Sequence, residues 1–189
     1  MKEIIKRSIL AAILISLGVA VSLTLNNTIG TFLFAFGLLG VCVLNLNLFT
    51  GKCGYWWKNN KKELLIVLIT NLIIGYICGL LLNIANPALI IIAIEKIASW
   101  SFSLSFFIKS IFCGIIMYLC VDIYKKGEKL GIFFGVPLFI FCGFQHCIAN
   151  IIILGIAHSF SWTIILAILG NLLGSMIINI LQEELKQNT

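Results

Sequence analysis

The stretch GFQHCIAN, residues 143–150, places a histidine, a glutamine and an asparagine in an otherwise apolar part of the chain. The segment GIFFGVPLFIFCG (131–143) leads into it, and IIILGIA (151–157) follows it. A buried polar side chain without a hydrogen-bond partner costs free energy, so such a cluster needs either partners or a function. The fold must therefore explain how His146, Gln145 and Asn150 are accommodated.

The rest of the chain has the composition of a membrane protein. Of 189 residues, 61% are hydrophobic and 11% are charged, and the mean hydropathy is +1.13. The apolar residues form blocks of about 18 or more, the length that crosses a bilayer as a helix. We therefore predict an all-α integral membrane protein, with residues 1–189 forming a single transmembrane domain. Its six transmembrane helices are expected at about 8–25, 31–50, 64–82, 104–121, 130–154 and 161–181.

One further apolar segment, PALIIIAI (87–94), is too short to cross a bilayer. A run of this length is typical of a re-entrant or interfacial segment. We therefore expect it to lie at one surface of the membrane, between the third and fourth transmembrane helices.

The net charge of +6 is explained by membrane topology. With six helices, all but two of the 13 lysines and arginines, Lys96 and Lys109, fall on one side of the bilayer. The positive-inside rule places that side, and both termini, in the cytoplasm. This pattern favours a multi-pass protein of the plasma membrane and gives no reason to expect a nucleic-acid partner.

Several kinds of chemistry have no sequence signal here. The seven cysteines form no C-x-x-C pair, so neither a zinc site nor a disulfide framework is indicated. The expected spans contain no HExxH motif, no nucleophile–base pair and no pair of carboxylates. We therefore expect neither an enzyme nor a protein with a cofactor or a metal ion.

The two halves of the chain resemble each other at a spacing of 100 residues. NLIIG begins at Asn71 and NLLGS at Asn171, while Thr50 and Asn150 each lie 21 residues before these asparagines. Three helices in each half, about 1–86 and about 100–189, predict an inverted 3+3 repeat.

The second helix of each predicted repeat mixes glycine with polar residues, in LNLNLFTGKCG (44–54) and CGFQHCIAN (142–150). Unwound backbone at membrane depth is tolerated only inside protein or beside a cavity. We therefore predict that helices 2 and 5 are broken and lie beside one central path.

The polar residues in the spans allow two interpretations. Asn71 and Asn171 suit interhelical hydrogen bonds as well as a transport pathway, and Lys109 can reach the membrane interface through its long side chain. His146 favours a function, because an ionisable group deep in a span is costly and rare. Its role should involve a proton or an anion.

Five segments together resemble the formate/nitrite transporter family. In chain order they are LGVCVLNLNLFTG, TNLIIGYICGLLL, FIKSIFCGIIMYLCV, CGFQHCIANIIIL and LGNLLGSMI. The resemblance covers all six expected spans. It implies an aquaporin-like protomer in a homopentamer, with one pore per protomer. The substrates that it implies are small monovalent anions of weak acids, namely formate, nitrite, hydrosulfide, acetate or lactate.

The resemblance also implies roles for particular residues. Thr50 would lie beside the pore histidine, His146, and Lys96 would make the outer vestibule electropositive. The apolar constrictions would be Phe34, Leu38, Leu48 and Phe139.

Three positions depart from the family pattern. Gln145 replaces an acidic residue, Gly114 stands where asparagine is common, and Lys52 follows LFTG in place of asparagine. We therefore do not transfer the substrate preference of other members to this chain.

Our functional hypothesis is proton-coupled passage of a small weak-acid anion, formate first, through an apolar pore with a central histidine. A bare anion loses its hydration in an apolar slit, whereas the neutral acid crosses far more easily. The expected partners are the anion, protons and the lipid bilayer. The alternative is a pore for a neutral small solute such as water, glycerol or ammonia. The residues expected along the pathway are His146, Thr50, Lys96, Asn150 and Asn171.

Overall fold

The computed structural model describes residues 1–56 and 60–187. Lys58, one of the basic residues predicted to lie on the cytoplasmic side, therefore falls outside the described residues. Within them the chain forms nine α-helices and a short 3₁₀ turn, η1 (Cys53–Tyr55). The helices are α1 (Lys2–Leu25), α2 (Thr28–Val43), α3 (Phe49–Lys52), α4 (Lys61–Ala85), α5 (Leu89–Ala98), α6 (Leu104–Lys125), α7 (Leu130–Phe141), α8 (Cys147–Ile156) and α9 (Thr163–Gln187).

Four of the predicted spans coincide with one long helix each. Helices α1, α4, α6 and α9 have 22 to 25 residues, and each is long and apolar enough to cross a membrane. The predicted ranges 31–50 and 130–154 differ, because each contains two helices: α2 and α3 in the first, α7 and α8 in the second. The segment predicted to be re-entrant or interfacial forms α5, which continues to Ala98 and includes Lys96.

The outer surface of the molecule is apolar. Large hydrophobic side chains are exposed along several helices, for example Phe36 on α2, Leu65 on α4 and Phe134 on α7. A water-soluble protein rarely exposes apolar side chains on this scale, so the surface suits lipid or a further protein subunit.

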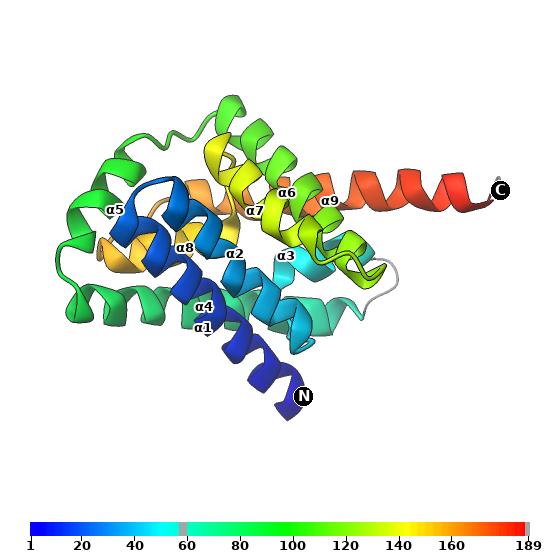
Figure 1. The fold of residues 1–189 in the computed structure, drawn as a ribbon, viewed down its shortest axis with the longest axis horizontal. Helices are drawn as coiled ribbons and strands as arrows, with labels where there is room; N and C mark the ends of the chain where they lie inside the picture. The colour runs from blue at the N-terminus through cyan, green and yellow to red at the C-terminus, as the bar shows by residue number, and fades with distance from the viewer. Residues whose placement is uncertain (57–59, 188–189) are drawn as a thin grey trace.

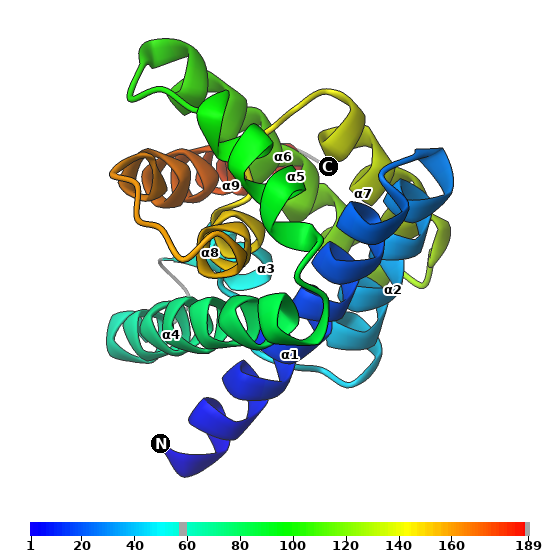
Figure 2. The same ribbon diagram turned by 90° about the vertical axis from the view of Figure 1, so that its left-hand side faces the viewer.

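Helix α8 is buried over its whole length. Figure 2 shows α8 near the middle of the molecule, with α4 next to it and with α2 and α7 farther off, at the right of the view. The largest helix–helix interfaces join α6 to α9, α1 to α2 and α4 to α8. Figure 1 shows α9 running out to the C-terminus as a long, nearly straight helix.

The α6–α9 interface depends on a close backbone approach. A Cβ atom added to Gly114 of α6 would overlap the backbone of Asn171 in α9, and one added to Gly174 would overlap Ile111 in the same way. Glycine is therefore required at position 114, because a larger side chain would push α9 away.

The two loops that interrupt the apolar runs have the same backbone geometry. After α2, Asn45 has a φ of 50° and the N–H of Leu46 bonds to the carbonyl of Val41 at 2.8 Å. After α7, Gly143 has a φ of 65° and the N–H of Phe144 bonds to the carbonyl of Phe139 at 2.9 Å. Both are Schellman-type helix ends, in which a left-handed residue turns the chain away from the helix axis.

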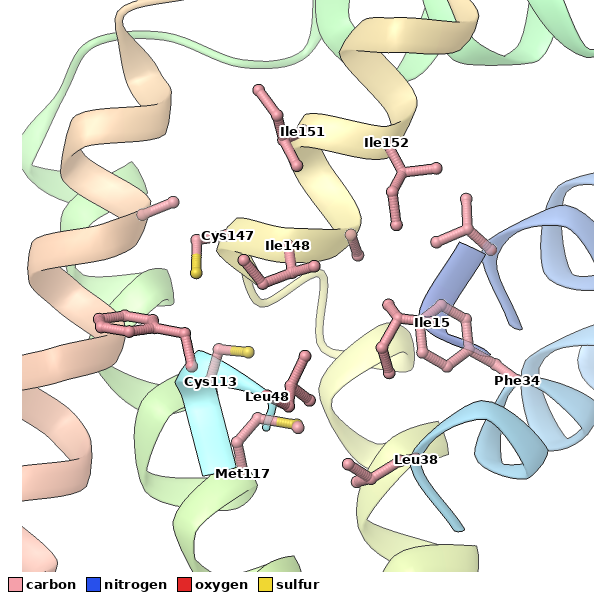
Figure 3. Packing of buried hydrophobic residues seen from close by; sticks show 14 of the residues in the cluster. Ile15, Phe34, Leu38, Leu48, Cys113, Met117, Cys147, Ile148, Ile151 and Ile152 are labelled. Carbon is pink, nitrogen blue, oxygen red and sulfur yellow. The ribbon is translucent and has the colours of Figure 1, made fainter. Parts of the chain in front are cut away.

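Both loops lead into a short helix that points into the protein. Helix α3 begins after Leu48 and α8 begins after His146. Leu48, the N-cap residue of α3, lies in one buried cluster with Cys147 and Ile148, the first two residues of α8 (Figure 3). The turns therefore bring residues 48 and 146 to equivalent positions at the centre of the molecule.

Candidate functional site

Two cavities enter the protein from opposite ends of α6. The first, which we call the Lys96 cavity, has a volume of about 330 Å³ and is lined by the early residues of α6, the end of α5 and the loop before α8. The second, the Lys52 cavity, has a volume of about 460 Å³ and is lined by the late residues of α6 and the loop between α2 and α3.

His146 lies at the inner end of the Lys96 cavity. Its side chain is 2% exposed, it lines the cavity, and its ring packs against Phe139 with a centroid distance of 5.7 Å. As the N-cap residue of α8, it uses Nδ1 to accept a hydrogen bond from the backbone N–H of Ala149 at 3.0 Å. Helix N-caps satisfy otherwise unpaired backbone donors, which explains why a polar residue is needed here.

The bond to Ala149 determines where the imidazole carries its proton. A backbone N–H can only donate, so Nδ1 has no hydrogen, and a neutral ring must carry its hydrogen on Nε2. Nε2 lies 2.9 Å from Oγ1 of Thr50, so the ring donates to the Thr50 hydroxyl. A second proton could bind only at Nδ1, at the cost of the N-cap bond.

Thr50 and Asn150, the other two polar residues of the predicted pathway near this ring, have different partners. Thr50 is fully buried in α3, and its hydroxyl joins the two short helices through His146. Asn150 lies one turn into α8 and lines the Lys96 cavity, where its Nδ2 donates to Oε1 of Gln145 at 3.0 Å. The Gln145 amide also donates to the carbonyl of Gly143 at 2.9 Å, so the polar cluster in GFQHCIAN is largely satisfied internally.

A layer of apolar side chains separates the two cavities. Phe34 and Phe139 line the Lys96 cavity and pack edge to face with centroids 5.9 Å apart. Leu38 and Leu48 line the Lys52 cavity, and both are 1% exposed. Phe34 and Leu38 are one helical turn apart on α2, about 6 Å along its axis. The four residues expected from the family resemblance to be constrictions therefore occupy a thin barrier between the cavities.

Asn171 holds the backbone on both sides of His146. Its Oδ1 accepts from the N–H of Cys147 at 2.9 Å, and its Nδ2 donates to the carbonyls of Gln145 and Ser110, both at 2.8 Å. The side chain is fully buried and does not line either cavity. Asn171 therefore fixes the backbone of the loop that carries His146.

Asn71 makes the same contacts in the other half of the chain. Its Oδ1 accepts from the N–H of Phe49, and its Nδ2 donates to the carbonyls of Asn47 and Ser8. Phe49 thus corresponds to Cys147, and Leu48 corresponds to His146, at a spacing of 98 residues. The sequence comparison paired Thr50 with Asn150 instead, because the asparagines themselves are 100 residues apart and the two connecting stretches differ in length.

Both cavities contain a second lysine. Lys109 of α6 lines the Lys96 cavity together with Lys96, although its position suggested only a side chain reaching the membrane interface. Lys125 at the end of α6 lines the Lys52 cavity with Lys52. The signal that could have found both is their place near the two ends of one helix, α6.

Comparisons with known proteins agree with this architecture. The model of the family described as formate/nitrite transporter matches residues 1–182. The uncharacterized transporter YrhG of Bacillus subtilis (strain 168) is 29% identical over 184 residues, which cover 82% of this chain and 69% of that protein.

Two solved structures have the same fold. An FNT family ion channel superimposes with a TM-score of 0.79 at 19% identity, covering 97% of this chain and 90% of the channel. A pentameric formate channel with formate bound gives a TM-score of 0.79 at 18% identity, covering 100% of this chain and 98% of the channel.

The family match spans nearly the whole chain and includes both short helices and all four long apolar ones. The chain therefore belongs to the formate/nitrite transporter family, and it is a multi-pass membrane channel or transporter rather than an enzyme.

Proposed function

We propose that the chain conducts small monovalent weak-acid anions, formate first and nitrite, hydrosulfide, acetate or lactate as further candidates, with one proton for each anion. The observation that carries this proposal is the thin apolar barrier between two lysine-bearing cavities, with the His146–Thr50 pair beside it. The formate bound in the pentameric channel that shares the fold supports the choice of anion.

The proposed topology has six crossings. Helices α1, α4, α6 and α9 each form one, while α2 with α3 and α7 with α8 form two interrupted crossings of an aquaporin-like protomer. The matching loop geometry and the matching Asn71 and Asn171 contacts support an inverted repeat, about 1–86 and about 100–189. Such interrupted helices are the usual place of binding sites in repeat-built transporters.

The orientation follows from where the termini lie. Arg7 donates to the carbonyl of Asn45 near the Lys52 cavity, and Gln182 of α9 accepts from Tyr118 in the late part of α6. Both termini thus lie at the Lys52 end. We propose that this end faces the cytoplasm of a cell whose plasma membrane holds the protein as a homopentamer, as in the pentameric channel with the same fold.

The barrier decides which form of the substrate crosses. A carboxylate between Phe34, Phe139 and the two leucines would lose its hydration and gain no opposite charge, which costs many kcal/mol. The neutral acid avoids this cost. Lys96 raises the local concentration of the anion, and the anion takes a proton before it enters the barrier.

The role of His146 follows from its hydrogen bonds. With Nδ1 committed to Ala149, the ring offers a single N–H to Thr50 or to an anion at the inner end of the cavity. We propose that the Nε2–H donates a hydrogen bond that holds the anion at the inner end of the cavity, and that the anion takes its proton directly from the water of the Lys96 cavity while the ring stays neutral. A donor of this kind must lie within hydrogen-bond reach of the group that it holds.

The test is uptake of ¹⁴C-formate into proteoliposomes at several external pH values. His146→Phe should lose most of the proton-coupled uptake, whereas His158→Phe, which changes the other histidine of the chain, should keep it. Full proton-coupled flux in His146→Phe would refute the role of the histidine.

Two further measurements complete the test. Lys96→Ala should raise the half-saturating formate concentration and weaken its dependence on salt. If neither quantity changes, Lys96 has no role in the proposed pathway. Liposome swelling with glycerol compared with formate decides between an anion pathway and a pore for a neutral solute, because only the latter admits glycerol at a comparable rate.

A further inference from the structure

Helix α4 has one face inside the protein and an opposite face outside it. The inner face packs against α1 and α8, and its buried residues are Leu64, Val67, Asn71, Gly75 and Gly79. Large apolar side chains are exposed at a regular spacing of four residues, at Leu65, Ile69, Ile73, Ile77 and Leu81. They lie two positions beyond the buried residues, about 200° around the helix. We call this outward row of five residues the α4 stripe.

The α4 stripe ends in lysines at the Lys52 end of the molecule. Lys61 continues the spacing of four by one turn, Lys62 follows it, and both side chains are exposed. The acidic residue of this first turn, Glu63, lines a small cavity together with Lys52 and Leu64. Its carboxylate therefore belongs to the inner face of α4, and the outer face carries a positive charge.

Trp56 lies next to these lysines. It follows η1 and packs, partly buried, against the hydrophobic core. The Nζ of Lys61 lies 6.0 Å from the centre of the Trp56 ring, at the outer limit of a cation–π contact. Tryptophan combines an apolar ring with an N–H donor and is enriched at membrane interfaces. The end of the stripe thus offers two cations and an aromatic donor.

Helix α9 has the same apolar pattern but the opposite charge. Its exposed residues at a spacing of four are Ile165, Leu169, Leu173, Ile177 and Leu181. At the Lys52 end this row leads to Glu183 and Glu184. A ligand with apolar chains and a negative head would be repelled there and attracted to α4, so charge distinguishes two otherwise similar surfaces.

The dimensions of the α4 stripe match one leaflet of a bilayer. Half of the hydrocarbon core is about 15 Å thick, which about ten helical residues span at about 1.5 Å each. Leu65, Ile69 and Ile73 fall within this length. Lys61 lies one turn beyond them, at the level of the headgroups.

We propose that the lysine end of the α4 stripe binds an anionic phospholipid. Its phosphate contacts Lys61, Lys62 and Trp56, and its acyl chains cover the first three residues of the stripe. The inference goes beyond the proposed function, because it concerns a lipid on the outer surface and not an anion in the pathway. Under the proposed topology the lipid belongs to the cytoplasmic leaflet, whose anionic lipids attract basic residues next to a transmembrane helix.

A lipid bound in this way connects two parts of the protein. Trp56 follows η1, which comes directly after α3, and the two lysines begin α4. A ligand that binds only the folded state stabilises it. The bound lipid should therefore stabilise the packing of η1 beside the start of α4.

The test compares two lipids with identical acyl chains, dioleoylphosphatidylglycerol and dioleoylphosphatidylcholine, on the intact detergent-solubilised protein. Native mass spectrometry reports the fraction of protein that carries lipid at each concentration. Phosphatidylglycerol should bind at least about fivefold more tightly, which is the factor expected for one lysine beside an anionic headgroup.

Variants assign this preference to the proposed residues. Lys61→Gln and Lys62→Gln should each weaken phosphatidylglycerol binding about fivefold and leave phosphatidylcholine binding unchanged. The matched control is Lys129→Gln, which removes an exposed lysine just before α7 and should leave both unchanged. Glycerol 3-phosphate, which has the phosphate without acyl chains, should not displace the lipid at equal concentration.

Three results would overturn the proposal. Equal affinities for the two lipids would show that the site does not recognise an anionic headgroup, as would be found if a neighbouring protomer covered the stripe. An equal loss in Lys61→Gln and Lys129→Gln would assign the preference to overall charge. Displacement by glycerol 3-phosphate would indicate a site for a soluble anion. None of these measurements involves formate, so their failure is distinguishable from a failure of the proposed function.

Discussion

Replacing Asn171 with leucine should destabilise the protein more than any other exchange of one polar side chain on α9. Leucine has the same branched arrangement of heavy atoms but removes three hydrogen bonds, to Cys147, Gln145 and Ser110. The N–H of Cys147 stays buried without a partner, which costs about 1–3 kcal/mol, and the carbonyl of Gln145 loses about 1 kcal/mol. Ser110 lies within α6, where its carbonyl keeps a helical partner. We therefore expect a loss of about 2–4 kcal/mol in the free energy of unfolding.

The assay is reversible unfolding in mixed micelles, followed by tryptophan fluorescence, with Asn179→Leu as the matched control. Asn179 is also buried on α9 but donates one hydrogen bond, to Oη of Tyr118, so its loss should cost about 1 kcal/mol. Asn71→Leu should resemble Asn171→Leu, since it removes the equivalent contacts. Losses for Asn171 and Asn179 that agree within about 0.5 kcal/mol would refute the reasoning that Asn171 holds the loop around His146.

Three further changes test the site and the packing. Thr50→Val removes the hydroxyl that lies 2.9 Å from Nε2 of His146 at nearly constant volume, and should lower formate uptake several-fold while the protein amount in the membrane stays the same. Phe34→Ala removes one side of the contact with Phe139, so hydrated anions should leak and planar-bilayer recordings should show a formate current that the parent lacks; an unchanged conductance would contradict the barrier. Gly114→Ala should reduce the yield of folded protein in size-exclusion chromatography, because its Cβ would overlap the backbone of α9.

Much of the fold could be predicted because membrane insertion leaves a strong signal. Helices α1, α4, α6 and α9 correspond to long apolar blocks, since in lipid every backbone polar group must bond within its own segment. The ends of α2 and α7 were harder to place, because apolar residues continue on both sides of each loop. The polar residues around Thr50 and His146 indicated that the two apolar helices are interrupted there. They did not indicate that Asn45 and Gly143 are the residues at which the chain turns.

The candidate site was only partly accessible from sequence. His146 stands out because an ionisable residue in an apolar block is rare. The residues expected to form the constrictions were indicated by the family resemblance. Two features depend on three-dimensional packing that no spacing reveals. The three hydrogen bonds of the Asn171 side chain all go to backbone atoms. Lys109 lines a cavity because α6 and the loop before α8 meet there.

The most direct test of the account measures what crosses the barrier with each formate. Proteoliposomes containing the parent protein and an internal pH indicator are given a ¹⁴C-formate gradient, while a voltage-sensitive dye reports net charge movement. The account predicts that one proton enters with each formate and that no net charge moves, because the apolar layer of Phe34, Phe139, Leu38 and Leu48 admits the neutral acid alone. One negative charge transferred per formate, with no accompanying proton, would contradict it.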